Sequence, residues 1–369
     1  MLKVILRKLA YELDNAWAMA RLPWHRQQLM ERLSQAMPAL NIETTNICNA
    51  NCTFCAYQFQ ERPTGVMSDE LFRKPIDEYV ECGGGWLGLT PTVGDPLVDK
   101  KLVERIQYAR SKPQIGEIFM YSNLISLDLH GVDELLRSGI SSLSVSTSGM
   151  DPEMYSRVYR SRQYKTMLDN IKRFARANNA AGRPVYFSID MRVDRPIKEV
   201  ESFPDHREVV DLIGAQNITI KFRYDNWSGK IKPTELSGNM RLRRNWKPRV
   251  SACHLMFSGP MVYWDGKVGA CSCRDLNASE LIIGDASKKH LGEVWFGEQI
   301  RQLREEFTTD KVRDICRTCT HYNSLSHLLT RKGQASLANL HRSPFLDRVP
   351  TSTSESGPRH VELPVLGPK

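Results

Sequence analysis

Short β-rich runs alternate with helical patterns through residues 39–224 of this 369-residue chain. The helical segment 98–109, for example, places Val98, Leu102 and Ile106 on one face. Alternating strands and helices predict an α/β fold whose parallel sheet has right-handed crossovers and is either open or curled into a barrel. Six strand–helix units are fewer than the eight of a closed barrel. The β-rich runs are 40–45, 86–90, 117–122, 142–147, 185–191 and 218–224.

The rest of the chain divides into segments of different character. The predicted domains are an amphipathic helical extension (1–38), the α/β core (39–224), a basic connector (225–249), a cysteine-bearing module (250–325), and a C-terminal helix with a disordered tail (326–369). In the extension, Ile5, Leu9, Leu13 and Trp17 recur every four residues. Because such a stripe normally faces a protein core, we expect it to dock onto the body of the protein rather than onto a membrane surface.

Composition and hydropathy argue against a wholly disordered chain and against a membrane-spanning protein. Hydrophobic residues make up 41% of the chain and charged residues 25%, which is ordinary for a globular protein. No run approaches the ~18–20 apolar residues of a membrane-spanning helix, and the N-terminus lacks a secretory signal pattern, so we expect a cytoplasmic protein. The net charge of +9 favours anionic partners. In a reducing compartment, the closely spaced cysteines indicate metal binding or catalysis rather than disulfides.

Three cysteines lie in one loop directly after the first predicted strand. Cys48, Cys52 and Cys55 form a Cys-x3-Cys-x2-Cys series. Soft thiolates suit iron–sulfur sites, and three of them can hold three irons of a [4Fe–4S] cluster while the fourth iron stays open. Structural zinc is disfavoured, because it needs four ligands and neither a histidine nor a fourth cysteine lies close by.

This loop resembles the signature of the radical S-adenosylmethionine (SAM) superfamily. The resemblance includes an aromatic residue before the third cysteine, Phe54, and another just after it, Tyr57. It implies a partial (β/α)6 TIM-type barrel that binds a [4Fe–4S] cluster and SAM. The implied chemistry is reductive cleavage of SAM to a 5′-deoxyadenosyl radical, which abstracts a hydrogen atom from the substrate.

Residues at the carboxyl ends of later strands extend the resemblance, because catalytic groups of such barrels lie there. The segment 90–97, with Gly94 and Asp95, is similar to the family's Gly-Gly-Glu-Pro segment that holds the SAM amine, although Val93 and Asp95 depart from it. Arg192 is a candidate partner for the SAM carboxylate, since a guanidinium fits a carboxylate. Each residue taken alone could equally make a structural hydrogen bond. The further candidates for binding SAM are Asn123, Ser146 and Ser188.

The C-terminal module contains a second series of cysteines, Cys253-x17-Cys271-x44-Cys316-x2-Cys319. Four thiolates make a closed site, for which zinc and iron–sulfur compete on spacing alone. A tight hairpin around Gly266 is expected just before Cys271. After a radical SAM core, this layout resembles the twitch domain, a shortened SPASM domain, which implies one auxiliary [4Fe–4S] cluster.

Two cysteines and a basic run stay outside these series. Cys273 is a spare ligand, an inert thiol or a hydrogen-atom donor, with the inert thiol favoured and the donor as the catalytic candidate. Cys82 is predicted to be structural. The run 241–249 contains four arginines and could bind an anionic group, although a solvated surface run is favoured.

The resemblance favours oxidation of an alcohol or sugar-like small molecule, because the single auxiliary cluster resembles that of twitch-bearing dehydrogenases. A thiol-dependent epimerase is the second hypothesis. A peptide-modifying maturase is less favoured, because 38 N-terminal residues are too few for a separate peptide-recognition domain. From another class, a non-enzymatic zinc protein that binds nucleic acid stays open, although nucleic acid is not the expected partner. The expected partners are a small-molecule or sugar-like substrate, an anionic one included, and an external reductant such as a flavodoxin or ferredoxin.

Overall fold

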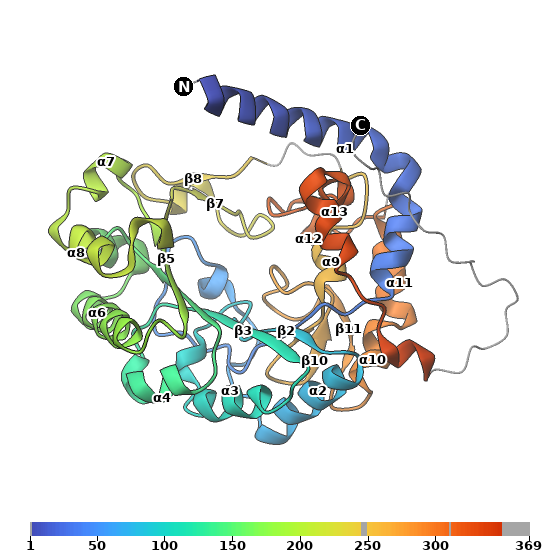
Figure 1. Cartoon of the computed structure of the whole chain (residues 1–369), viewed down its shortest axis with the longest axis horizontal. Helices are drawn as coiled ribbons and strands as arrows, with labels where there is room; N and C mark the ends of the chain where they lie inside the picture. Colours follow the sequence, from blue (N-terminus) through green and yellow to red (C-terminus); the bar gives the residue numbers. More distant parts are fainter. Residues whose placement is uncertain (1, 245–248, 310, 349–369) are drawn as a thin grey trace, which may run out of the picture.

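A curved sheet forms the centre of the protein (Figure 1). The computed structural model describes residues 2–244, 249–309 and 311–348. Six strands of the sheet run parallel and are neighbours in chain order, which confirms the predicted α/β partial barrel. These strands are β1 (Ala39–Ile42), β2 (Gly85–Gly88), β3 (Ile115–Ser122), β4 (Ser142–Thr147), β5 (Tyr186–Arg192) and β6 (Ile218–Lys221).

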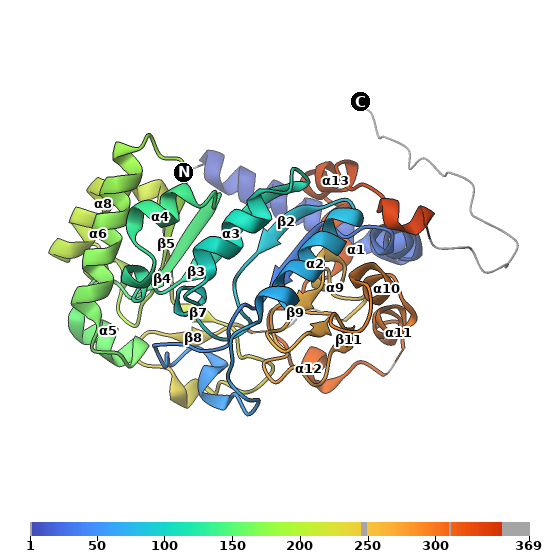
Figure 2. The same cartoon turned by 90° about the horizontal axis from the view of Figure 1, so that it is seen from below.

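Helices flank this sheet on its outer side (Figure 2). Each crossover helix turns a stripe of apolar residues toward the sheet, such as Phe72 and Ile76 in one helix and Ile171 and Phe174 in another. Burial of these stripes holds the strand ends, and therefore the loops that follow them, in place. The crossover helices are α2 (Asp69–Glu81), α3 (Leu102–Arg110), α4 (Val132–Arg137), α5 (Pro152–Tyr159), α6 (Tyr164–Ala180), α7 (Ile197–Val200) and α8 (Pro204–Ile213).

The C-terminal module continues the same sheet. Its strands are β9 (Met261–Val262), β10 (Lys267–Gly269) and β11 (Ile282–Asp285), and its helices are α9 (Leu255–Ser258), α10 (Leu291–Trp295), α11 (Glu298–Glu306) and α12 (Asp314–Arg317). The predicted C-terminal helix follows the module as α13 (Arg331–Ala338). β9 pairs in parallel with β1, and β10 pairs with both β9 and β11 in antiparallel fashion. The predicted hairpin around Gly266 is the β9–β10 turn, where Gly266 has φ +90°. The sheet therefore runs through nine strands from the module into the barrel.

The join between β1 and β9 needs a glycine at position 259. Gly259 has φ +139°, and a Cβ there would lie 1.8 Å from the carbonyl oxygen of Ala39. Only glycine allows the two backbones to approach this closely. The backbone N–H of Asn41 then donates to Pro260 O (3.0 Å), and that of Glu43 donates to Val262 O (2.9 Å).

The connector differs in detail from its prediction. The β-rich run 218–224 is split into β6 and a two-residue strand, β7 (Arg223–Tyr224), which pairs in parallel with β8 (Arg241–Leu242) inside the basic segment. Phe222 interrupts the run between the two strands. The part of the basic run at 245–248 and the predicted disordered tail after 348 lie outside the described residues.

The N-terminal extension is one helix, α1 (Leu2–Ser34), but the prediction of its docking face was wrong. Leu9, Leu13 and Trp17 are exposed, and the side chain of Ile5 lies outside the described part of the chain. The buried residues of α1 are instead Ala18, Leu22, Leu29 and Leu33. The predicted stripe is exposed because the first half of the helix extends beyond the body, whereas the second half packs against the segment Leu325–Leu329 (Figure 1). Among the described residues, no helix is long and apolar enough to cross a membrane.

Candidate functional site

The loop after β1 brings Cys48, Cys52 and Cys55 together. The Tyr57 hydroxyl ties the loop closed, because it accepts a hydrogen bond from the backbone N–H of Cys48 (3.2 Å) and lies 3.4 Å from Cys48 O, to which it donates. The backbone N–H of Cys55 donates to Cys52 O at 3.1 Å. Tyr57, predicted as a SAM-binding residue, therefore shapes the cysteine loop itself.

Burial makes these three thiols hard to ionise without a cation. It raises the pKa of Cys48 to about 12, helped by the charge of Asp95. Burial also raises the pKa of Cys52 and of Cys55, against the opposing charge of Arg192. Three grouped thiolates would repel one another, so the set needs bound cations to be stable. This donor chemistry fits an iron–sulfur cluster.

Four cysteines of the C-terminal module line one small cavity. Cys253 precedes α9, Cys271 follows β10, and Cys316 and Cys319 lie in and just after α12. Backbone N–H groups point at two of the sulfurs: that of Asn323 lies 3.5 Å from Cys253 Sγ, and that of His321 lies 3.3 Å from Cys319 Sγ. Burial raises the pKa of Cys253 to about 11 and that of Cys316 to about 12. Backbone donors aimed at sulfur suit thiolates that ligate a cluster.

Comparison with known proteins agrees with both cysteine sets. Residues 42–201 match the family model of the radical SAM superfamily, and residues 253–320 match the SPASM model, described as an iron–sulfur cluster-binding domain. The chain belongs to the radical SAM superfamily. A radical SAM enzyme with a SPASM domain uses SAM, a [4Fe–4S] cluster for SAM cleavage and auxiliary iron–sulfur binding.

The curated relatives of this radical SAM enzyme are similar at low identity. One is a GTP 3′,8-cyclase of Vibrio cholerae serotype O1, 24% identical over 151 residues, which cover 40% of this chain and 44% of the relative. The chain thus spans less than half of that relative's length. Another is a GTP 3′,8-cyclase of Mannheimia succiniciproducens, 21% identical over 306 residues, which cover 78% of this chain and 86% of the relative.

Solved structures share the fold. Streptococcus suis SuiB bound to the precursor peptide SuiA has a TM-score of 0.54 and 13% identity, and the match covers 85% of this chain and 77% of SuiB. Native anSMEcpe with bound AdoMet has a TM-score of 0.53 and 13% identity, and the match covers 82% of this chain and 98% of that protein. At these identities the likeness shows the radical SAM fold.

Asp95 is buried within the radical SAM core, and its carboxylate oxygens accept hydrogen bonds from other residues of the chain. Its carboxylate accepts from the backbone N–H of Leu97 (3.0 Å), from the Ser122 hydroxyl (2.9 Å) and from the backbone N–H of Asn123 (2.6 Å). The neighbouring Gly94 has φ +133°, and a Cβ there would lie 3.0 Å from Thr45 O. Asp95 therefore joins the loops that follow β2 and β3, while Gly94 packs against the start of the cysteine loop.

Asn123 contacts the cysteine loop directly. Its Nδ2 donates to Asn49 Oδ1 at 2.6 Å and lies 3.9 Å from Cys48 Sγ. Its own Oδ1 accepts from the backbone N–H of Ile125 at 3.0 Å. Asp95 and Asn123 thus form a chain of contacts from the ends of β2 and β3 to the first cysteine.

Of the remaining predicted residues, Ser146 lies near the carboxyl end of β4, whereas Ser188 lies in the first half of β5. The Ser146 hydroxyl is 2.9 Å from that of Tyr159, and Ser188 pairs with Ser144 across the two strands at 2.8 Å. Ser146 and Ser188 therefore have partners within the chain, and each hydroxyl keeps two of its three hydrogen-bonding sites.

Arg192 and Phe54 lie together at the same edge of the sheet. The guanidinium lies over the Phe54 ring, with 5.4 Å between its Cζ and the ring centroid, and Phe54 stacks on Tyr224 at 5.4 Å. Arg192 Nη1 also lies 3.8 Å from Asp190 Oδ2. Arg192 also lies near enough to the first cysteine set for its charge to act on Cys52 and Cys55, against the burial that raises their pKa values.

Arg274 lies between the two cysteine sets and was not recognised as a site residue from the sequence. It is buried, pairs with Asp225 at 3.0 Å, and lies over the Trp227 ring at 4.7 Å. Burial raises the pKa of Cys55 in the first set and of Cys273 beside the second, and the charge of Arg274 opposes that rise at both thiols. The Trp227 indole N–H donates to Phe54 O at 3.0 Å, which links the connector to the first loop.

Asp225 completes this link. Burial acts to raise its pKa, but the His321 hydrogen bond and the charges of Arg274 and Arg243 outweigh burial and lower it to about 2. The three residues lie in separate segments of the sequence: Asp225 is in the connector, Arg274 directly follows Cys273, and His321 follows the last cysteine. The position of Arg274 beside a cysteine is the one sequence signal for this network. Sequence reasoning could not bring these three residues together.

Cys273 and Cys82 differ in their surroundings. Cys273 does not line the cavity of the four cysteines, but it lies near enough to raise the pKa of Cys271 and Cys253. Cys82 is buried at the end of α2, where its carbonyl oxygen accepts from the Ser343 hydroxyl at 2.7 Å.

Three arginines of the basic run, Arg241, Arg243 and Arg249, contact their own chain. Arg243 pairs with Asp225 at 3.3 Å. Arg249 donates to Cys316 O (3.3 Å) and Cys319 O (2.7 Å), so it holds the loop of the last two predicted ligands.

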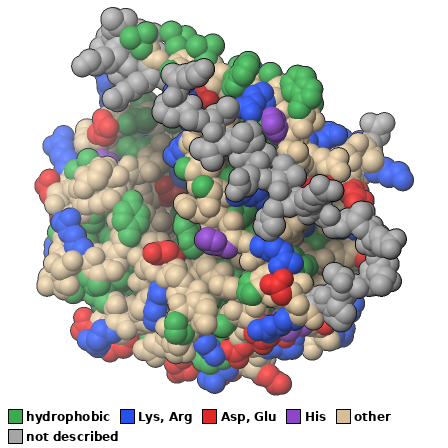
Figure 3. Space-filling model, turned by 45° about the vertical axis from the view of Figure 1, so that its right-hand side comes forward, with side chains coloured by type: hydrophobic (Ala, Val, Ile, Leu, Met, Phe, Trp, Pro, Cys, Tyr) green, Lys and Arg blue, Asp and Glu red, His purple; other side chains and the backbone are tan. Residues whose placement is uncertain are grey.

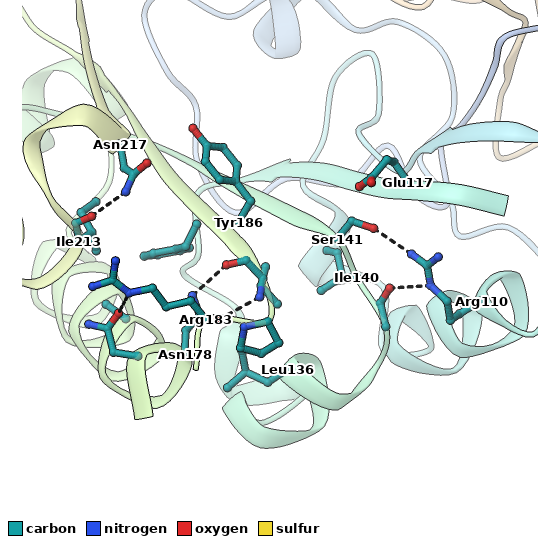
Figure 4. Close-up of a pocket in the computed structure, with 16 residues that line it drawn as sticks. Arg110, Glu117, Leu136, Ile140, Ser141, Asn178, Arg183, Tyr186, Ile213 and Asn217 are labelled. Carbon is teal, nitrogen blue, oxygen red and sulfur yellow. Dashed lines mark hydrogen bonds between the residues drawn. The ribbon is translucent and has the colours of Figure 1, made fainter. Parts of the chain in front are cut away.

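A wide cavity of about 730 Å³ lies at the opposite ends of the strands (Figure 4). Glu117 and Tyr186 lie near the starts of β3 and β5, and Ser141 directly precedes β4. Arg110 reaches into the wall, but its guanidinium donates to Gly139 O and to the Ser141 hydroxyl, both at 2.8 Å. This cavity contains none of the predicted site residues.

Proposed function

We propose that this radical SAM enzyme oxidises an alcohol or sugar-like small molecule, with one auxiliary [4Fe–4S] cluster as electron acceptor. The observation that carries the proposal is the set of four thiols around one cavity, joined to the SAM-site loop through Arg274 and Trp227. Four protein ligands leave no open iron for a substrate, so such a cluster suits electron transfer.

The chain's own residues have distinct roles in this proposal. Cys48, Cys52 and Cys55 would hold the first cluster, and the auxiliary cluster would be held by Cys253, Cys271, Cys316 and Cys319. When bound, SAM and the clusters supply hydrogen-atom abstraction and a place for the second electron. An external reductant, for which a flavodoxin or ferredoxin is our candidate, supplies the first electron.

The residues at the strand ends would bind and orient SAM. Arg192 offers its guanidinium to the SAM carboxylate. Asp95 acts as a positioning residue, because its oxygens are occupied by Leu97, Ser122 and Asn123. Phe54, Tyr57, Gly94, Ser146 and Ser188 shape or line the same region.

Oxidation of an alcohol to a carbonyl removes two hydrogens, one as an atom and one as a proton, together with an electron. We assign the proton to Asp190 Oδ2, which lies 3.8 Å from Arg192 Nη1 and also receives the Lys221 ammonium. The contact with Arg192 places this carboxylate beside the guanidinium that we assign to the SAM carboxylate.

Two alternatives have observations in their favour. The names of the curated relatives favour cyclisation of a purine nucleotide. The half-buried Cys273 thiol near the second set keeps a thiol-dependent epimerase open. The three reactions differ in their products: oxidation removes two hydrogens, epimerisation introduces one solvent deuterium at unchanged formula, and cyclisation consumes GTP.

The first experiment counts iron and sulfide in anaerobically reconstituted protein and assays SAM cleavage with dithionite. About eight irons are expected in the wild type and about four in Cys48→Ala/Cys52→Ala/Cys55→Ala or in Cys316→Ala/Cys319→Ala. The triple variant should lose SAM cleavage, because it lacks the cluster that cleaves SAM, whereas Cys316→Ala/Cys319→Ala should keep it. Cys82→Ala, a buried cysteine outside both sets, is the matched control and should keep about eight irons. Fully loaded protein that does not cleave SAM would refute the proposal.

A further inference from the structure

A stripe of large apolar side chains on α1 faces away from the protein. Leu6, Leu9, Leu13, Trp17 and Trp24 are exposed by 55%, 53%, 69%, 64% and 76%. At 3.6 residues per turn, these five positions fall within an arc of about 80° on the helix surface. The space-filling view shows hydrophobic side chains along the upper rim, where α1 runs (Figure 3). We call these five residues the α1 stripe.

The body of the protein packs against a different face of α1 from the one that carries the stripe. The opposite side of the same helix carries the docking residues Ala18, Leu22 and Leu29, which are buried. Polar contacts add to this attachment: Arg26 donates to Val250 O at 3.3 Å, and Arg32 donates to Leu337 O at 2.7 Å. Because the body already holds one face of α1, the stripe is left for a partner outside the described chain.

The sequence of the segment that carries the α1 stripe has a positive net charge. The first 25 residues contain Lys3, Arg7, Lys8 and Arg21 against Glu12 and Asp14. Asp14 accepts a hydrogen bond from the backbone N–H of Arg331 at 3.2 Å, which places the start of α13 beside α1. Arg331 and Lys332 are exposed there. A helix with leucine and tryptophan on one face and lysine and arginine around it is the pattern of helices that lie in a membrane interface.

We propose that α1 docks onto the surface of an anionic phospholipid bilayer, with the α1 stripe buried in the boundary between headgroups and acyl chains. Trp17 and Trp24 match the preference of tryptophan for the headgroup level. The basic residues attract anionic lipid, because the surface of such a bilayer has a negative potential. A second copy of the chain fits less well, because it would bring two positively charged helices together.

Vesicle flotation of the full-length protein tests this proposal. Wild type should float with vesicles of phosphatidylglycerol and phosphatidylcholine, bind at least tenfold more weakly to phosphatidylcholine alone, and dissociate as salt is raised. Leu13→Glu/Trp17→Glu should bind the anionic vesicles at least tenfold more weakly. Trp86→Glu/Leu129→Glu replaces exposed apolar residues elsewhere on the surface and should bind as wild type does.

Further readouts separate binding from misfolding. Circular dichroism of Leu13→Glu/Trp17→Glu should match that of wild type, and tryptophan emission of wild type should shift to the blue on anionic vesicles. Wild type that does not float, or that floats no better than Leu13→Glu/Trp17→Glu, overturns the proposal. Light scattering that shows a dimer lost in that variant, without any vesicle binding, overturns it in favour of a second copy.

Discussion

Asp95 shows how one buried carboxylate can organise a site without contacting the chemistry. Burial raises its pKa, while hydrogen bonds from Asn123, Ser122 and Leu97 act to lower it. Those donors belong to the loops after β2 and β3, and Asn123 in turn contacts the loop of Cys48. The acid at this position of the sequence motif is therefore explained by its partners within the chain.

Asp95→Asn should destabilise the protein by about 1–3 kcal/mol, because the amide directs N–H groups at donors that need an acceptor. Urea denaturation checks this. The exposed Asp169→Asn is the matched control and should stay within about 0.5 kcal/mol of wild type. Equal stability of the two variants would mean that the hydrogen bonds to Asp95 are dispensable.

His206 gives the protein a pH dependence far from the cysteines. It is buried in α8, and burial lowers its pKa below 6.5 against the opposing charge of Glu201. The folded state therefore binds this proton less readily than the unfolded state, so stability is lost as pH falls below 6.5. Wild type should lose more unfolding free energy between pH 7 and pH 5.5 than His206→Gln does. Parallel loss in both proteins would exclude His206 as the cause.

At the scale of elements, α1 has two apolar faces, of which one is buried and the other is exposed. The face with Leu22 and Leu29 packs on the body, and the face with Leu13 and Trp17 does not. Periodicity of one residue in four identifies a helix with an apolar stripe, but it does not say which stripe meets the core.

Alanine substitutions distinguish the two faces. Leu29→Ala should lower the unfolding free energy by about 2–5 kcal/mol, because it leaves a cavity in the core. Leu13→Ala removes the same atoms from an exposed site and should change stability by about 0.5 kcal/mol or less. Denaturant melts of the two variants provide the measurement, and a larger loss in Leu13→Ala than in Leu29→Ala would show that α1 docks through the other face.

At the scale of the whole molecule, the module and the barrel share one sheet. β9 pairs with β1, so the module that carries the auxiliary thiols is joined to the strand that leads into the Cys48 loop. Gly259 makes this join possible, since any side chain there would clash with Ala39 O. Loss of order in the module should therefore reach the barrel.

Hydrogen exchange tests this coupling. In Cys316→Ala/Cys319→Ala, loss of the auxiliary cluster should speed amide exchange in β9–β11 and at Asn41 and Glu43, whose N–H groups donate to residues 260 and 262. Amides between β4 and β5 should keep their protection. If faster exchange stays confined to residues after 250, the two parts of the sheet unfold independently.

Features that are local in the chain could be predicted from the sequence. The spacing of Cys48, Cys52 and Cys55 within one loop, and the alternation of strands and helices, depend on covalent spacing and on the periods of helix and strand. Cys253 and Cys271 belong to a longer-range set, whose prediction as one auxiliary cluster rested on the resemblance to the twitch domain, because zinc and iron–sulfur compete on spacing alone.

Contacts between distant segments needed the tertiary structure. Asp225 and Arg274 meet only when the connector folds over the module, and β1 meets β9 only when Gly259 lets two backbones approach. The face of α1 that docks depends in the same way on what the body presents to it. These contacts depend on which distant surfaces bury one another, and the free energy of that burial is a property of the assembled fold, whereas the spacing of residues in a loop or a helix is a property of the chain.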